Sequence, residues 1–245
     1  MSLHGSYLPP PPPPLRYEAI PTPEELRSRI EPWVVFDFSY AMLTTPHDEK
    51  HTYGAINTLL GSIFPVSRRF KTTPQAVLCR AIPPDAVFSA PMLERDVSTG
   101  SSGAYHQSSE AGGIEHELQY TDFITAKWVS EPSTSMHVYY LMGIFEIKRD
   151  KDTLSEAEGQ VKGYLMTAYP RLWRRRDLPA YLFIGGIGEV RKYVFGILEN
   201  GNVGAVIARI FHLSNPVDAE ALLLDLCSAA SDCWNRSNVD EYPLA

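Results

Sequence analysis

The stretch "YYLMGIFEIKRD", residues 139–150, decides how the middle of the chain folds. It begins with apolar and aromatic residues, which is typical of a strand that is buried on both faces. Side chains alternate between the faces of an extended chain, so we expect Glu146 and Lys148 to share a face with Met142 and Ile144. An acid and a base in a buried strand need partners, because removing either ion from water costs several kcal/mol.

The composition is that of a globular protein, with 245 residues and 44% hydrophobic content. We expect one domain at 21–237, between a proline-rich N-terminal extension at 1–20 and a tail at 238–245. A Ser- and Gly-rich segment at about 89–114 predicts a flexible loop within that domain. The three cysteines form no CxxC pair, so neither a disulfide framework nor a structural zinc site is expected.

The chain has no apolar run long enough for a membrane span and no secretory signal pattern. We therefore expect an intracellular protein, nuclear or cytoplasmic, without a membrane partner. Pro9 to Pro14 are six consecutive prolines, which favour polyproline II. This segment is either a stiff spacer or a ligand for a protein that binds proline motifs. The oligomeric state stays open.

The order of apolar patterns and capping residues predicts an α/β fold around a mixed sheet. Thr22 as N-cap and Glu25 form a capping box, with Pro23 at the first helical position, and Asn215 with Pro216 marks another helix start. The expected elements are a helix at 22–30, a strand at 33–43, a helix at about 46–63, a hairpin of strands at 116–128 and 136–149, a helix from Leu154, a strand from Ala180, a hairpin turning at Asn200 and Gly201, and a helix from Pro216.

Asp122 is the best second carboxylate for Glu146, because it lies near the middle of the preceding strand. In an antiparallel pair the two carboxylates would lie side by side and repel, unless a divalent cation lay between them. The carbonyl of Ile147 would then add a third oxygen. Lys148 could orient an attacking water or stabilise charge on a phosphate. The alternatives are an exposed Glu146–Lys148 ion pair and a strand-end position for Asp122.

Asp122 followed by "EIK" at 146–148 resembles the PD-(D/E)XK nuclease superfamily. The resemblance implies a restriction-endonuclease-like three-layer core, in which a mixed central sheet is flanked by helices. It also implies Mg²⁺ or Mn²⁺ bound by Asp122, Glu146 and the Ile147 carbonyl, with Lys148 as a catalytic residue. The resemblance covers mainly residues 45–200, and Thr121 stands where the motif often has proline.

In that superfamily a glutamate on an earlier helix often completes the metal site, and Glu49 is the candidate here. It precedes Tyr53 by four residues, on the stripe with Ile56, although a helix start favours an acid in any case. Glu115 and Glu117 are competing candidates.

Gln160 and Tyr164 in "QVKGY" fit the Q-x-x-x-Y motif of RecB-like members, in which the glutamine orients the site or contacts substrate. Residues four apart share a helix face, so both side chains could lean over the metal. The alternative is a solvated glutamine beside a partly buried tyrosine.

The segment "RLWRRRD" concentrates Arg171, Arg174, Arg175 and Arg176 in a chain of net charge -7. The overall charge excludes a protein that coats nucleic acid through bulk charge, so a DNA or RNA partner would need such a local patch. The alternative is a solvated helix end. The sequence thus predicts a metal-dependent nuclease, with an inactive nuclease-fold binding module or an unrelated α/β fold as alternatives.

Overall fold

The computed structural model of the chain describes residues 13–44, 49–79, 118–131, 136–148, 154–169 and 174–238. The elements in chain order are α1 (Pro23–Ser28), α2 (Pro32–Leu43), α3 (Glu49–Ile63), the short 3-10 helix η1 (Val66–Arg68), β1 (Phe70–Cys79), β2 (Leu118–Glu131), β3 (Met136–Lys148), α4 (Leu154–Ala168), β4 (Ala180–Ile184), β5 (Glu189–Ile197), β6 (Val203–His212) and α5 (Pro216–Asp232).

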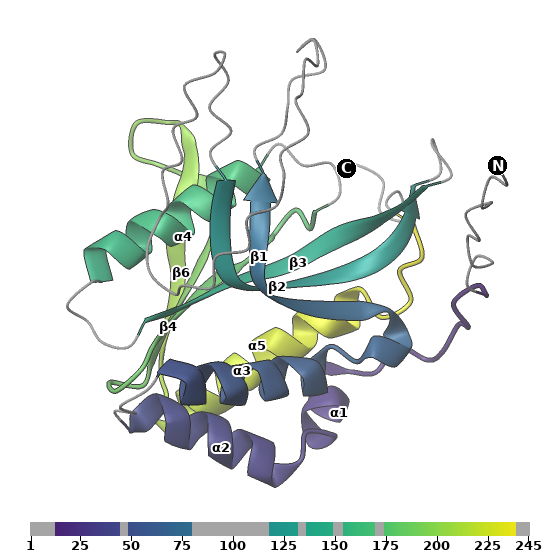
Figure 1. Cartoon of the computed structure of the whole chain (residues 1–245), viewed down its shortest axis with the longest axis horizontal. Coiled ribbons are helices and arrows are strands. Elements are labelled where there is room, and N and C mark those ends of the chain that lie inside the picture. The colour runs from purple at the N-terminus through teal and green to yellow at the C-terminus, as the bar shows by residue number, and fades with distance from the viewer. Residues whose placement is uncertain are drawn as a thin grey trace, which may run out of the picture.

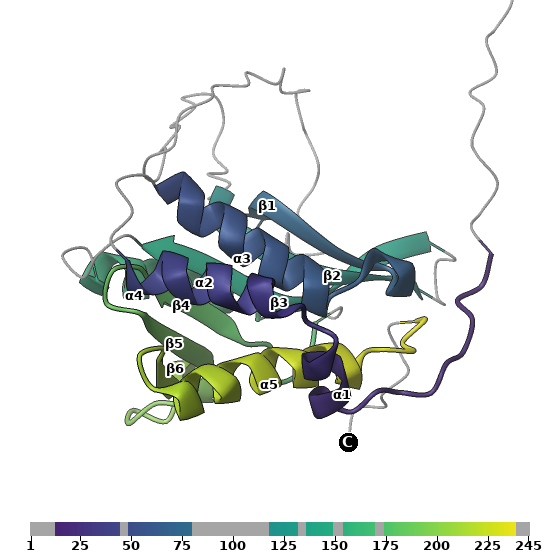
Figure 2. The same ribbon diagram turned by 90° about the horizontal axis from the view of Figure 1, so that it is seen from below.

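The six strands form one mixed sheet in the order β1-β2-β3-β4-β5-β6. Only the β3–β4 pair is parallel, and α4 is the crossover that joins these two strands. Helix α4 covers one face of the sheet, and α1, α2, α3 and α5 cover the other (Figures 1 and 2). The predicted α/β fold with a mixed sheet between helices is confirmed.

The two sides of β3 belong to two separate cores. Phe145 and Ile147 pack toward the four-helix layer. Ile144 packs beneath α4, together with Leu182 of β4. Glu146 therefore lies in a strand that is buried on both faces, and it follows Ile144 on the α4 face.

The expectation that Met142 shares the face of Ile144 is wrong, because β3 contains a bulge. Thr125 of β2 is opposite Gly143, but the next residue of β2 is opposite Leu141. Met142 is thus an extra residue in β3, and it packs toward the four-helix layer.

The strand predicted at 33–43 is also wrong, because these residues form helix α2. Its buried residues, Val34, Phe38, Ala41 and Met42, follow helical spacing. Trp33, Phe36 and Tyr40 are large and exposed, so the helix is apolar on most of its surface. Such a pattern cannot distinguish a strand from a helix, and packing against α3 decides between them.

The other predicted elements are confirmed, including both hairpins and the caps. The capping box is formed by Thr22 and Glu25, and Asn215 caps α5. Helix α3 begins at Glu49, and the predicted start at 46 lies outside the described residues, as do the loop at 89–114 and Pro9 to Pro12.

The segment before α1 packs against the domain, although we predicted an extension as far as residue 20. Arg68 donates to the carbonyl of Arg16 at 2.9 Å, and the Glu18 N–H donates to Asn235 at 3.2 Å. Asn238 forms a bridge with Ser130 of β2. Within the described ranges, no helix is both long and apolar enough to cross a membrane.

Candidate active site

At Asp122 the side chains of β2 change the face of the sheet toward which they point. Phe123 packs against Tyr53 of α3, with ring centroids 5.4 Å apart, whereas the Gln119 side chain accepts a hydrogen bond from Thr167 of α4 at 2.8 Å. In a regular strand residues 119 and 123 would share a face. On β1, the residue between the partners of Thr121 and Phe123 is Gln75, whose φ is 47°. Gln75 and Asp122 form no ladder pair, and this irregularity coincides with the change of face in β2.

The strands β2 and β3 also separate at Asp122. Their pairing ends at Phe123 and Phe145, whereas β2 stays paired with β1 as far as Leu118. In Figure 1 the ends of β1 and β2 rise away from β3, which continues beside β4. The Asp122 side chain can therefore enter the space between the two strands.

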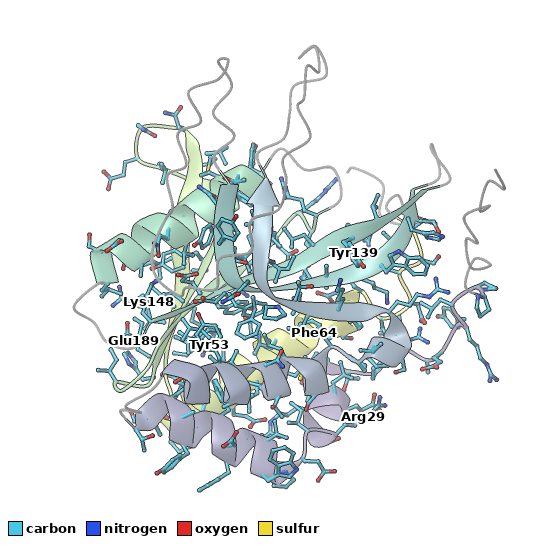
Figure 3. The ribbon with its side chains drawn as sticks, in the orientation of Figure 1. Arg29, Tyr53, Phe64, Tyr139, Lys148 and Glu189 are labelled. Carbon is cyan, nitrogen blue, oxygen red and sulfur yellow. The ribbon has the colours of Figure 1, made fainter. Side chains whose placement is uncertain are left out.

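Both oxygens of the Asp122 carboxylate accept hydrogen bonds from neighbouring elements. The Ile147 N–H of β3 donates to Oδ2 at 2.6 Å, and the Tyr53 hydroxyl of α3 donates to Oδ1. Figure 3 shows Tyr53 between α3 and the sheet. Two donors from different elements fix the carboxylate, and each oxygen keeps a lone pair for another ligand.

Burial raises the pKa of the Asp122 carboxyl. The hydrogen bonds from Tyr53 and Ile147 oppose that effect, as does the Lys148 charge, and the charge of Asp122 in turn raises the pKa of Glu146. The two carboxyl groups are therefore close enough to interact, as the sequence predicted.

Glu146 is 4% exposed, and its Oε1 lies 2.9 Å from the Lys148 ammonium. Its Oε2 is buried and has no hydrogen-bond partner among the described residues. Burial and the charge of Asp122 raise the pKa of Glu146 to about 7, although Lys148 lowers it. The site thus holds an ion pair and one buried acceptor that a further cation or donor could satisfy.

The backbone of Ile147 faces Asp122. Ile144 donates its N–H to Pro179 at 3.1 Å, and Lys148 accepts from Gly185 at 2.7 Å, so these even-numbered residues bond toward β4. The N–H and carbonyl of one residue in a strand point the same way, so the Ile147 carbonyl faces the β2 side. It has the orientation that the sequence analysis required of a third oxygen ligand.

Helix α4 brings Tyr164 to the same site. Its hydroxyl donates to the carbonyl of Tyr120 in β2 at 2.6 Å. Burial raises the pKa of Tyr164, and the charges of Glu146 and Asp122 raise it further. The tyrosine is therefore near both carboxylates.

Gln160 lies one turn before Tyr164 on α4. Its Oε1 is buried and has no hydrogen-bond partner in the described part of the chain. Glu49 opens α3 one turn before Tyr53, but its side chain lies outside the described residues, as do Glu115 and Glu117.

The predicted arginine patch does not form one surface. Arg175 is 8% exposed and pairs with Asp177 at 2.6 Å and Asp232 at 3.0 Å. The prediction that Arg175 binds nucleic acid is corrected, because its guanidinium is buried and already paired with two carboxylates. Arg174 folds back over Tyr169 and Phe195, at 5.2 Å and 4.8 Å from the ring centroids. Arg176 is exposed, and Arg171 lies outside the described residues.

The residues present suit a hard divalent cation better than a softer metal. No group of three or more His, Cys, Asp or Glu side chains gathers anywhere in the described ranges. Asp122 and Glu146 supply two carboxylates, and the Ile147 carbonyl adds an uncharged oxygen; Gln160 on α4 carries a further oxygen without a hydrogen-bond partner among the described residues. Mg²⁺ is often bound in this way, by one or two carboxylates and several waters.

The sequence reasoning missed Tyr53 as a site residue, because it assigned this residue to an apolar stripe. The stripe placed Tyr53 on the correct face of α3, but only the fold shows that its hydroxyl meets Asp122. A polar tip on an otherwise apolar helix face is the signal that could have indicated this contact.

Comparison with known proteins gives limited similarity. No family model matches the chain, and no solved structure matches it. The chain is 25% identical over 109 residues to proteins named enolase-phosphatase E1 from three strains of Pseudomonas aeruginosa. The match covers 42% of this chain and 40% to 44% of those proteins, so it spans less than half the length of either. It does not show membership of a family.

Proposed function

We propose that this protein is a metal-dependent nuclease of the PD-(D/E)XK type, with a restriction-endonuclease-like core, that hydrolyses phosphodiester bonds in DNA or RNA. The observation that carries the proposal is the meeting of Asp122 with Glu146 and Lys148 where β2 and β3 separate. Unpaired buried oxygens on Glu146 and Gln160 support it, because buried acceptors are rarely left without a partner.

Asp122 and Glu146 would hold Mg²⁺ or Mn²⁺, with the Ile147 carbonyl as a third ligand and Gln160 beside them. A bound cation of this kind would polarise a phosphoryl oxygen and lower the pKa of a water molecule. The Tyr53 hydroxyl and the Ile147 N–H would keep the Asp122 carboxylate in one orientation for this role.

Lys148 is 24% exposed at its side chain, so its ammonium can meet a substrate while it stays paired with Glu146. There it would orient the attacking water and stabilise the charge that develops on the phosphate. Tyr164 keeps its proton at neutral pH, and its hydroxyl donates that hydrogen to the Tyr120 carbonyl at the edge of the site.

The test is cleavage of single- and double-stranded DNA and RNA by purified protein with Mg²⁺ or Mn²⁺. Lys148→Ala should abolish cleavage and leave the circular dichroism spectrum unchanged. The ion pair between Lys162 and Glu158 on α4 provides a matched control, because Lys162→Ala also removes a lysine that is paired with a glutamate. Failure of the wild-type protein to cut any of these substrates would refute the enzymatic proposal.

The alternative is an inactive module that keeps the nuclease fold for binding, which the net charge of -7 favours. Calorimetric titration with Mn²⁺ separates the two. A catalytic site binds Mn²⁺ in the wild-type protein but not in Asp122→Ala, whereas an inactive module shows no binding that depends on Asp122.

A further inference from the structure

A second group of side chains gathers at the end of the sheet far from Lys148. We call it the stacking surface, and it consists of Arg69, Lys71, Trp128, His137 and Tyr139. Trp128 of β2 is directly opposite Tyr139 of β3, and directly opposite residues lie on one face of the sheet. Lys71 of β1 is opposite Ala126, two residues from Trp128, and so shares that face.

Each cation of the stacking surface lies over a ring, and two of the rings stack on each other. The Arg69 guanidinium is 5.2 Å from the centroid of Trp128, and the rings of Trp128 and His137 are 4.1 Å apart. The Lys71 ammonium is 4.9 Å from the centroid of Tyr139. Tyr139 remains 48% exposed, and His137 is exposed. Planar groups at this end of the sheet are therefore open to a further ring.

Neither cation of the stacking surface has a carboxylate partner among the described residues. The neighbouring Arg68 is paired with Glu18, and Arg191 is paired with Glu158 and Glu189. Arg69 donates instead to the neutral carbonyl of Pro13. Positive charge without a neutralising acid, in a chain of net charge -7, attracts an anionic ligand.

The stacking surface lies on the same face of the sheet as the candidate active site. Tyr139 shares its face with Leu141, and Leu141 and Ile144 both belong to the core beneath α4. Glu146 follows Ile144 on that face. Figure 3 shows Tyr139 and Lys148 toward opposite ends of β3. At about 3.3 Å per residue the two sites are roughly 20 Å apart, a distance that a few nucleotides span.

We propose that the stacking surface binds single-stranded nucleic acid. Aromatic rings stack on bases only where the bases are unpaired, and cations beside the rings bind the phosphates. In a duplex the faces of the bases are covered by their neighbours, so the rings would gain little. The choice of nucleic acid as ligand rests on the proposed nuclease function; the preference for single strands rests on the rings.

The test is fluorescence anisotropy with a fluorescein-labelled single-stranded oligonucleotide and with a blunt duplex of the same length. EDTA is present, so that no cleavage occurs. The single strand should bind more tightly. Tyr139→Ala should weaken its binding about 5- to 150-fold, the usual effect of losing one stacked base, and Tyr139→Phe should restore it. Lys71→Gln should lower the slope of log affinity against log salt by about 0.7.

A matched control is Tyr40→Ala on α2, because Tyr40 is 60% exposed in the helical layer on the other face of the sheet. The Tyr40→Ala variant should bind the single strand with the affinity of the wild type. His137→Ala gives a second test if Tyr139→Ala does not fold. Equal affinity for single strand and duplex, or wild-type affinity in folded Tyr139→Ala and His137→Ala, would overturn the proposal.

The binding and cleavage experiments can refute the two proposals independently of each other. Binding in EDTA that depends on Tyr139, without metal-dependent cleavage, would refute the nuclease and leave the stacking surface in place. Cleavage at the wild-type rate by Tyr139→Ala, with unchanged affinity, would refute the stacking surface and leave the nuclease in place.

Discussion

Replacing Glu146 with glutamine should stabilise the protein in the absence of metal. The carboxylate is 5% exposed at its side chain, and its pKa is raised from an ordinary value of 4.5 to about 7. This difference corresponds to about 3 kcal/mol of unfavourable free energy for the folded protein with Glu146 ionised. Glu146→Gln keeps the shape and removes the charge, and it also relieves the repulsion on Asp122.

The sign of the effect fixes its pH dependence. The folded state binds the proton of Glu146 more tightly than the unfolded state, so wild-type stability falls as pH rises from about 4.5 to about 7. The Glu146→Gln variant has no carboxyl group at this position, so its stability does not fall in this way. We expect Glu146→Gln to exceed the wild type by about 1 kcal/mol at pH 5 and about 3 kcal/mol at pH 8. The pKa of about 7 already includes the attraction of Lys148, so the loss of that ion pair does not lower this gain further.

Urea unfolding at pH 5 and pH 8, with EDTA present, measures both values. Glu199→Gln in the exposed hairpin between β5 and β6 makes the same change of charge, and its effect should stay within about 0.5 kcal/mol at either pH. Added Mn²⁺ should stabilise the wild type at pH 8 more than the variant. If the difference in unfolding free energy between the variant and the wild type does not increase from pH 5 to pH 8, the raised pKa of a buried Glu146 is refuted.

Three further substitutions test other contacts. Tyr53→Phe removes the donor to Asp122 and should weaken Mn²⁺ binding about 10- to 100-fold in calorimetry with an unchanged circular dichroism spectrum; wild-type affinity would show that the hydroxyl does not position the carboxylate. Lys127→Met should cost about 3 kcal/mol in urea unfolding, because the buried ammonium binds two carbonyls at the end of α5; a neutral result would exclude this cap. Thr22→Ala should cost about 1 kcal/mol and Thr22→Asn much less, whereas equal losses would argue against the capping box.

Several features follow from the sequence because their causes are local. The caps at Thr22 and Asn215 depend on residues within one turn. The hairpin around Asn200 depends on a two-residue turn signal, and its strands pair as predicted. The meeting of Asp122 and Glu146 could likewise be predicted from their spacing, since each stands next to the last antiparallel pair of β2 and β3, Phe123 and Phe145.

Other features required the tertiary structure, because residues far apart in the chain cause them. Helix α2 has no distinctive pattern, and its packing partner α3 decides its form. Arg175 looks like part of a surface patch until Asp232, from α5, is placed beside it.

The sequence by itself determined which residue types could form the site and on which strands they stand. Only the tertiary structure decided how they are held. The change of face in β2 at Asp122 coincides with an irregular backbone at Gln75 in β1, and the hydrogen bond to Asp122 comes from Tyr53 on helix α3, on the face of the sheet opposite α4. Such contacts join elements that are distant in sequence, so no local pattern of residues encodes them.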